Sequence, residues 1–184
     1  MSRTTIKVEL STSGINKAIR EVINYKREFL KKVDKYRLRL ADEIANIASV
    51  NFSSATMEDI VGTVMDKELV RGGGLRTPDV NVHVSDRGNI SVIVADGEDA
   101  IWCEFGAGVY HNGSVGSSPH PLGSEMGFTI GTYGYGRGKR QAWGYYNESG
   151  ETVVTRGTPA SMPMYNAAQE VMHKAIEIAR EVFG

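Results

Sequence analysis

The feature that most constrains this chain is a long stretch, residues 15–52, that contains neither proline nor glycine. Its apolar residues recur at steps of three, four and seven, so they fall on one stripe of an α-helix. At 1.5 Å per residue, such a helix is about 50 Å long. Because a small domain is narrower than that, we expect either a break in the helix or an exposed half. The stripe consists of Ile15, Ile19, Val22, Phe29, Val33, Tyr36, Leu40, Ile44 and Ile47.

Alternating segments elsewhere in the chain predict strands. Residues 4–10 alternate polar and apolar side chains and predict a short strand, after which Ser13 is the expected N-cap of the long helix. Residues 80–96 alternate on both sides of a turn that contains glycine, which predicts a hairpin. Residues 142–156 predict a second hairpin for the same reason. We therefore expect antiparallel pairing of neighbouring strands.

The last part of the chain, residues 164–183, predicts an amphipathic helix that pairs with the first one. Residues 53–79 are mixed: 57–70 fit a helix or a strand equally well, and the glycine run 72–74 is typical of a flexible loop. The expected buried stripe of the last helix consists of Ala168, Val171, Met172, Ala175, Ile178, Ala179 and Val182.

The order of these elements is typical of an α+β domain. We expect an antiparallel sheet of about four strands, packed by the long N-terminal helix and the C-terminal helix. The 184 residues are enough for one domain with its own core, so residues 1–184 are interpreted as a single domain. A long Gly-rich loop is expected as an insertion at about residues 106–140.

Composition and charge exclude several classes of protein. The net charge of -1 argues against a chain that binds nucleic acid through its overall charge. Its apolar runs are shorter than the ~18 residues of a membrane span, and MSRTTIKVEL lacks the apolar core of a signal peptide. The single cysteine excludes an internal disulfide and suits a reducing cytoplasm. A local basic excess remains over residues 15–50, with nine Lys/Arg against five Asp/Glu.

Cys103 is the residue that most invites a catalytic interpretation. A Cys/His hydrolase would use its thiolate as the nucleophile and His111 or His120 as the base. However, a neighbouring carboxylate such as Glu104 raises a thiol pKa rather than lowering it. Free cysteines are commonly buried and behave as small hydrophobic residues. We therefore interpret Cys103 as a core residue and expect no catalytic residues.

The histidines and the glycine-rich segments do not predict a cofactor. The four histidines, at positions 83, 111, 120 and 173, lack the spacing of zinc ligands. Residues 131–139, GTYGYGRGK, lack the Ser/Thr and the strand–helix context of a phosphate-binding loop. Their aromatic and basic side chains are instead typical of a recognition loop, and with the basic helix they leave a nucleic-acid-binding module as an alternative. The candidate contact residues are Tyr110, Tyr133, Tyr135, Arg137, Lys139, Arg140 and Trp143.

Three segments taken together resemble a known family. They are WCEFGAGVYHN (102–112), IGTYGYGRGKRQAWGYY (130–146) and TRGTPASMPMYNAAQEV (155–171). Their order and spacing resemble the phage head–tail joining family, the gene-product-ten-like neck or tail-completion proteins. In that family an aromatic-Glu-Phe-Gly stretch closes a strand, and a Pro-Ala-x-x-Pro turn later leads into the C-terminal helix. The matching residues are Glu104, Phe105, Gly106, Pro159, Ala160, Pro163, Met164 and Ala167.

The chemistry of these motif residues favours a structural role. Gly106 and Gly108 permit backbone turns that other residues resist. Phe105 is expected to point into the core, and Glu104 to cap or pair at a strand end. The entry to the last helix is stiffened by proline and filled by adaptable methionine, at Pro159, Pro163 and Met164.

The resemblance implies a non-enzymatic ring subunit of a tailed phage or prophage. Several copies would lie at the head–tail junction of the virion, in contact with other connector and tail proteins and transiently with DNA in the channel. Assembly would take place in the host cytoplasm, without a membrane. Subunits of such a ring meet through heterologous interfaces, and the loop at 106–140 is the expected contact with a neighbour. A head-side connector and a tail-side terminator both fit the resemblance.

Overall fold

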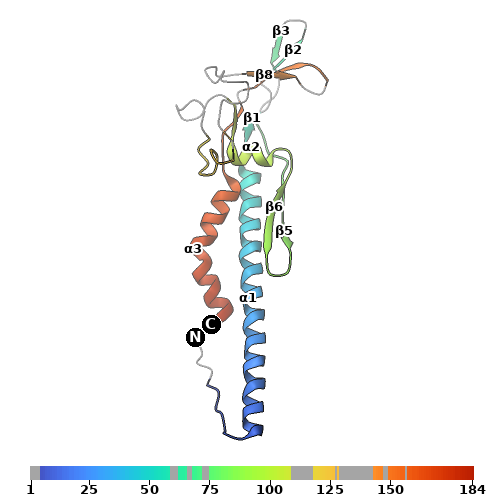
Figure 1. The fold of residues 1–184 in the computed structure, drawn as a ribbon. Helices are drawn as coiled ribbons and strands as arrows, with labels where there is room; N and C mark the ends of the chain where they lie inside the picture. Colours follow the sequence, from blue (N-terminus) through green and yellow to red (C-terminus); the bar gives the residue numbers. More distant parts are fainter. Residues whose placement is uncertain are drawn as a thin grey trace.

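The computed structural model describes residues 5–58, 62–65, 68–71, 75–108, 118–126, 128, 143–146, 149–155 and 157–184. The molecule is elongated (Figure 1), with helix α1 (Thr12–Ser54) as its longest element and helix α3 (Pro163–Phe183) beside it. The short helix α2 (Ala100–Phe105) lies at the C-terminal end of α1, near the small sheets. The strands are β1 (Met57–Glu58), β2 (Gly62–Met65), β3 (Glu68–Arg71), β4 (Leu75–Arg76), β5 (Asn81–Asp86), β6 (Ser91–Asp96), β7 (Ala107–Gly108), β8 (Trp143–Tyr146), β9 (Thr152–Thr155) and β10 (Gly157–Thr158).

Helix α1 begins earlier than the sequence predicts. The Ser11 side-chain oxygen accepts the backbone N–H of Gly14 at 3.0 Å, so Ser11 is the N-cap in place of Ser13. The strand predicted at residues 4–10 is wrong over the described residues 5–10, which form no strand. An alternating pattern of that length forms a strand only when a neighbouring strand pairs with it, and here none does.

The expectation that part of α1 is exposed is confirmed, because α1 is unbroken and every residue from 19 to 35 is exposed. The predicted buried stripe is therefore wrong in the first half of the helix. The residues that α1 buries lie mainly in its second half and are mostly small: Ala18, Ala41, Ala45, Ala48 and Phe52. Alanine allows close approach of neighbouring elements, which explains why the larger apolar residues alone did not mark the buried face.

The predicted pairing of the first and last helices is confirmed, and the two run antiparallel. Asn51 Nδ2 donates to the Pro163 carbonyl at 3.2 Å near the start of α3. Further along, the Tyr36 hydroxyl donates to the Ala175 carbonyl at 3.1 Å. On α3, Val171, Ile178 and Val182 are buried as predicted, together with Ala167. Met172 is 68% exposed, which corrects its assignment to the buried stripe.

Both predicted hairpins are confirmed over their described residues. β5 pairs antiparallel with β6, from Asn81 opposite Asp96 to Asp86 opposite Ser91. β8 pairs antiparallel with β9, from Trp143 opposite Thr155 to Tyr146 opposite Thr152. Of the undecided residues 57–70, those described (57–58, 62–65 and 68–70) form strands, while 53–54 belong to α1 and 72–74 lie outside the described residues.

The strands are distributed over separate sheets instead of one sheet packed by the helices. The larger sheet has the order β3-β2-β9-β8, and β1-β4, β10-β7 and β5-β6 form two-stranded sheets. The hairpin β5–β6 lies along α1 (Figure 1). Arg37 of α1 ties it there by donating to Asp86 Oδ1 at 2.6 Å and to Ser91 Oγ. The mixed α+β class with a long first helix and a C-terminal helix is thus confirmed.

The core lies where the end of α1 meets α2. Phe52, Met57 and Cys103 are its buried centre. The half-buried apolar residues packed around them come from the hairpin, from α2 and from the start of α3: Val80, Val82, Ala95, Ala100, Trp102 and Met164.

Candidate functional site

Helix α2 replaces the strand end that the sequence predicted for Glu104 and Phe105. Asp99 fixes its start. The two terminal guanidinium nitrogens of Arg76, Nη1 and Nη2, donate to the Asp99 carboxylate at 2.5 and 2.7 Å. The backbone N–H of Asp79 donates to the same carboxylate at 2.9 Å. Chiefly because of the hydrogen bonds from Arg76, the pKa of Asp99 is below its usual value. An ionised Asp99 therefore links α2 to the segment that precedes β5.

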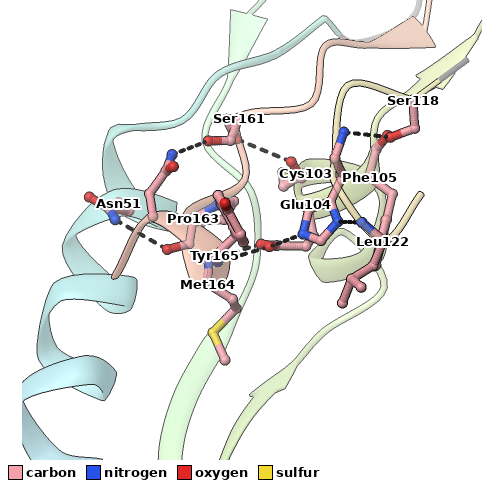
Figure 2. Close-up of polar contacts among 12 residues, drawn as sticks. Asn51, Cys103, Glu104, Phe105, Ser118, Leu122, Ser161, Pro163, Met164 and Tyr165 are labelled. Carbon is pink, nitrogen blue, oxygen red and sulfur yellow. Dashed lines mark hydrogen bonds and ion pairs between the residues drawn. The ribbon is translucent and has the colours of Figure 1, made fainter. Parts of the chain in front are cut away.

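Glu104 is a buried carboxylate that caps the start of α3 (Figure 2). Its Oε2 accepts the backbone N–H of Met164 at 2.8 Å, and its Oε1 accepts that of Tyr165 at 2.9 Å. A negative charge at a helix N-terminus also interacts favourably with the helix dipole. The expectation that Glu104 caps or pairs at a strand end is thus corrected: Glu104 lies in helix α2 and caps a distant helix. We call Glu104, His120 and these two N–H groups the Glu104 junction.

The first turn of α3 depends on this carboxylate because it has no cap of its own. Met162 precedes the helix in the left-handed region, with φ of 52°, and offers no capping side chain. Pro163 has no N–H, and the N–H of Asn166 donates to the Met162 carbonyl at 2.9 Å. The N–H groups of Met164 and Tyr165 have no acceptor within the helix, and Glu104 accepts their hydrogen bonds.

His120 completes the Glu104 junction from a separate segment. Its Nε2 lies 3.1 Å from Glu104 Oε1, and its Nδ1 accepts the backbone N–H of Leu122 at 3.0 Å. Since Nδ1 accepts a hydrogen bond, the ring carries its proton on Nε2, and this N–H donates a hydrogen bond to Glu104. Ser118 fixes the segment by donating to the Phe105 carbonyl at 2.6 Å and accepting the N–H of His120 at 3.2 Å.

Aromatic rings surround the imidazole of His120. The Phe105 ring lies 4.5 Å from it and the Tyr165 ring 5.3 Å, measured between centroids. On its other side, Phe105 stacks on Phe128 at 4.4 Å. Phe105 is half-buried in this aromatic cluster, which corrects the expectation that it points into the core.

Cys103 lies in the core, as predicted. Its side chain is fully buried, and burial, followed by the charge of Asp99, raises the pKa of the thiol to about 11. Its carbonyl accepts the N–H groups of Ser161 and Met162 at 2.9 and 3.2 Å, which ties the end of α2 to the segment before α3. Cys103 therefore serves the same connection as Glu104, through its backbone.

Gly106 ends α2 in a conformation that favours glycine, with φ of 79°. A Cβ at this position would lie 3.0 Å from the backbone nitrogen of Ala160. The chain needs this close approach because Gly108 of β7 pairs with Gly157 of β10 just beyond. The predicted turn at Gly106 is confirmed, and the motif residues Pro159 and Ala160 lie in the segment that passes it.

The polar side chains of the Glu104 junction are hydrogen-bonded within the chain. Every Glu104 oxygen accepts at least one hydrogen bond, and the carboxylate is buried with its partners. The Cys103 side chain packs with Phe52 and Met57, whereas His120 bonds to Glu104 and Leu122. Within the described part of the chain, no group of three or more His, Cys, Asp or Glu residues could hold a metal ion.

Most predicted contact residues lie outside the described residues. Trp143 begins β8. The other candidates lie outside the described residues, as does His111: Tyr110, Tyr133, Tyr135, Arg137, Lys139 and Arg140. Of the loop expected at about 106–140, the described parts contain β7 and a run of turns over 118–126.

Sequence reasoning missed the pairing of His120 with Glu104 and the contacts of Ser118 and Ser161. One signal in the sequence pointed to a distant cap for the last helix. Pro163 marks the first turn of a helix, yet Met162 before it has no capping oxygen. A helix start without a local cap requires an acceptor from elsewhere, and Glu104 is the carboxylate of segment 102–112, which also carries the resemblance.

Comparisons with protein-family models, curated proteins and solved structures find no match. Among the helices of the described residues, none is both long and apolar enough to cross a membrane.

The burial of Cys103 predicts that its thiol reacts slowly in the native protein. We expect a disulfide reagent to label the native protein far more slowly than the protein in denaturant, because a pKa of about 11 leaves little thiolate at neutral pH. The raised pKa also predicts that the thiol's contribution to the free energy of unfolding is constant below the ordinary thiol pKa of 9.0 and falls as pH rises from there to about 11. Since the chain has one cysteine, all labelling reports Cys103. Equal rates in both states would contradict its burial.

Proposed function

We propose that the chain is a structural virion assembly protein of a tailed phage or prophage, and a ring subunit at the head–tail junction. Its partners would be further copies of itself, other connector and tail proteins, and DNA passing through the channel. The proposal extends to its place in the virion and, during assembly, in the host cytoplasm.

The observation that carries the proposal is the Glu104 junction. It joins two of the three segments whose order resembles the head–tail joining family, 102–112 and 155–171. Glu104 from the first segment caps the helix that begins at Pro163 in the second. The resemblance therefore rests on residues that work together in the fold, and it assigns them a structural task.

The Cys/His hydrolase is the weaker interpretation. A nucleophilic cysteine needs a lowered pKa and access to a substrate. Cys103 has a raised pKa and a fully buried side chain. The chemistry of its surroundings thus opposes thiolate formation.

The nucleic-acid-binding alternative keeps one observation in its favour. The basic side chains of α1 between residues 26 and 35 are exposed: Lys26, Arg27, Lys31, Lys32 and Lys35. If they bind the phosphate backbone, affinity for duplex DNA falls steeply with salt. A log–log slope near zero would remove this alternative.

The decisive experiment disrupts this gene in the parent phage and examines lysates by negative-stain electron microscopy. We expect DNA-filled heads and separate, finished tails, because heads and tails form independently of the protein that joins them. Complementation with the wild-type gene or with Cys103→Ala, which removes only the thiol, should restore joined particles. Normal joined particles from the disrupted gene would refute the proposal.

A further inference from the structure

The N-terminal half of α1 extends past the helix that covers the rest of it (Figure 1). α3 ends at Phe183, whose ring packs on Phe29 and Tyr36 with centroid distances of 5.8 Å to each. All residues from 19 to 35 are exposed. The first turns of α1 therefore lack the helical neighbour that its later turns have.

This exposed half carries large apolar side chains on one side. Ile19 and Val22 are each 51% exposed, and Phe29 is 46% exposed. We call Ile15, Ile19, Val22, Phe29 and Val33 the α1 stripe. Large contiguous apolar patches on a protein surface mark interaction sites.

The α1 stripe has the spacing of a surface that packs against another helix. From Ile15 to Val33 its positions follow the alternating steps of four and three of a coiled coil, with Lys26 at the one polar position. The same row meets the end of helix α3 at Phe29 and again at Tyr36, through the ring of Phe183, and Phe29 remains 46% exposed. Lys26 can pack its stem and keep its ammonium in water, and a lysine at such a position fixes the register.

The spacing of the stripe positions also suits packing against a second copy of the same helix. Its steps, four, three, four, three and four, read the same from either end. Two copies running antiparallel therefore place Ile15 opposite Val33, and Ile19 opposite Phe29. Val22 then faces Lys26, so no lysine meets a lysine in the interface.

A lipid surface fits the same half of α1 less well. Basic residues favour anionic lipid, but Glu21, Glu28 and Asp34 recur through the segment, and Glu28 pairs with Lys31 at 2.8 Å. Binding to a lipid surface also does not require apolar residues at alternating steps of four and three, whereas packing against another helix does.

We propose that the α1 stripe is a self-association surface that packs antiparallel against the stripe of a second copy. This interaction does not depend on the head–tail proposal, because it follows from the helix alone. It assigns a homotypic contact to a surface distinct from the Glu104 junction.

The first test is the solution mass of the full chain by light scattering. We expect the wild type to have twice the mass of one chain, and Ile19→Glu to have the mass of one, because the new carboxylate would face Phe29 of the other copy. The matched control is Ile176→Glu on α3, which is 65% exposed and lies off the stripe, and it should keep the doubled mass. Circular dichroism should show unchanged helix content in both variants.

The second test fixes the direction of packing. Since Cys103 is buried, a cysteine introduced on α1 is the only accessible thiol. Ile23→Cys lies near the centre of an antiparallel pair and should cross-link to itself with a short bis-maleimide. Ile15→Cys lies far from its own counterpart and should not.

Several results would overturn the inference. A wild type of single-chain mass would do so, as would cross-linking of Ile15→Cys, which requires parallel helices. Binding to anionic phospholipid vesicles that Ile19→Glu abolishes would reassign the stripe to lipid. A larger ring whose mass is unchanged by Ile19→Glu would refute the α1 contact while leaving the head–tail proposal intact.

Discussion

Replacing Glu104 by alanine should lower the free energy of unfolding by about 3 kcal/mol. The substitution leaves the part-buried N–H groups of Met164 and Tyr165 and the buried Nε2–H of His120 without their acceptor. Unmade hydrogen bonds of buried groups destabilise more than the intact bonds stabilise. The loss of charge at the N-terminus of α3 adds to the effect. Urea unfolding followed by circular dichroism measures the change.

Two further variants separate the cap from the general effect of removing a glutamate. Glu104→Gln keeps one carbonyl oxygen but presents an amide donor to a backbone donor, so we expect an intermediate loss of about 1–2 kcal/mol. Glu125→Ala removes an exposed carboxylate from the neighbouring segment and should change stability by less than about 0.5 kcal/mol. If Glu104→Ala unfolded at the wild-type urea concentration, the junction would not support α3.

The elements with local signals could be predicted from the sequence. The long helix, both hairpins and the C-terminal helix follow from periodicity within a few residues. The N-cap was misplaced by two residues because Ser11 and Ser13 are equal candidates in sequence, and only the Gly14 contact distinguishes them. The strand predicted at 4–10 failed because alternation does not supply a partner strand.

The candidate site could be predicted only in part, because its contacts join distant residues. Glu104 was expected to cap or pair at a strand end, but its partners Met164 and Tyr165 lie about sixty residues later, at the start of a helix. The segment around Glu104 is too short for a clear period, and tertiary contacts made by Asp99 settle it as helix. The α1 stripe differs from the site, because its local periodicity is clear and predicts a buried face. That face is exposed in the single chain.

Phe52→Ala should be the most destabilising single truncation, with a loss of about 3–5 kcal/mol in the free energy of unfolding. Phe52 is 2% exposed and is the largest residue at the centre of the core, where it packs with Met57 and Cys103. Removing its ring leaves a cavity between the end of α1 and α2 that rigid neighbours cannot fill. Equilibrium unfolding in urea measures the loss, with the slope of the transition as a check on two-state behaviour.

The control for Phe52 lies two residues away on the same helix. Val50 is 63% exposed, and Val50→Ala should change stability by no more than about 0.5 kcal/mol, since alanine is the better helix former. A small loss for Phe52→Ala would mean that the core is not centred here. A large loss would show that α2 is held at this end of the molecule by apolar packing of Cys103 as well as by the hydrogen bonds of Glu104. The exposed half of α1 would then be free to contribute to association without contributing to the core.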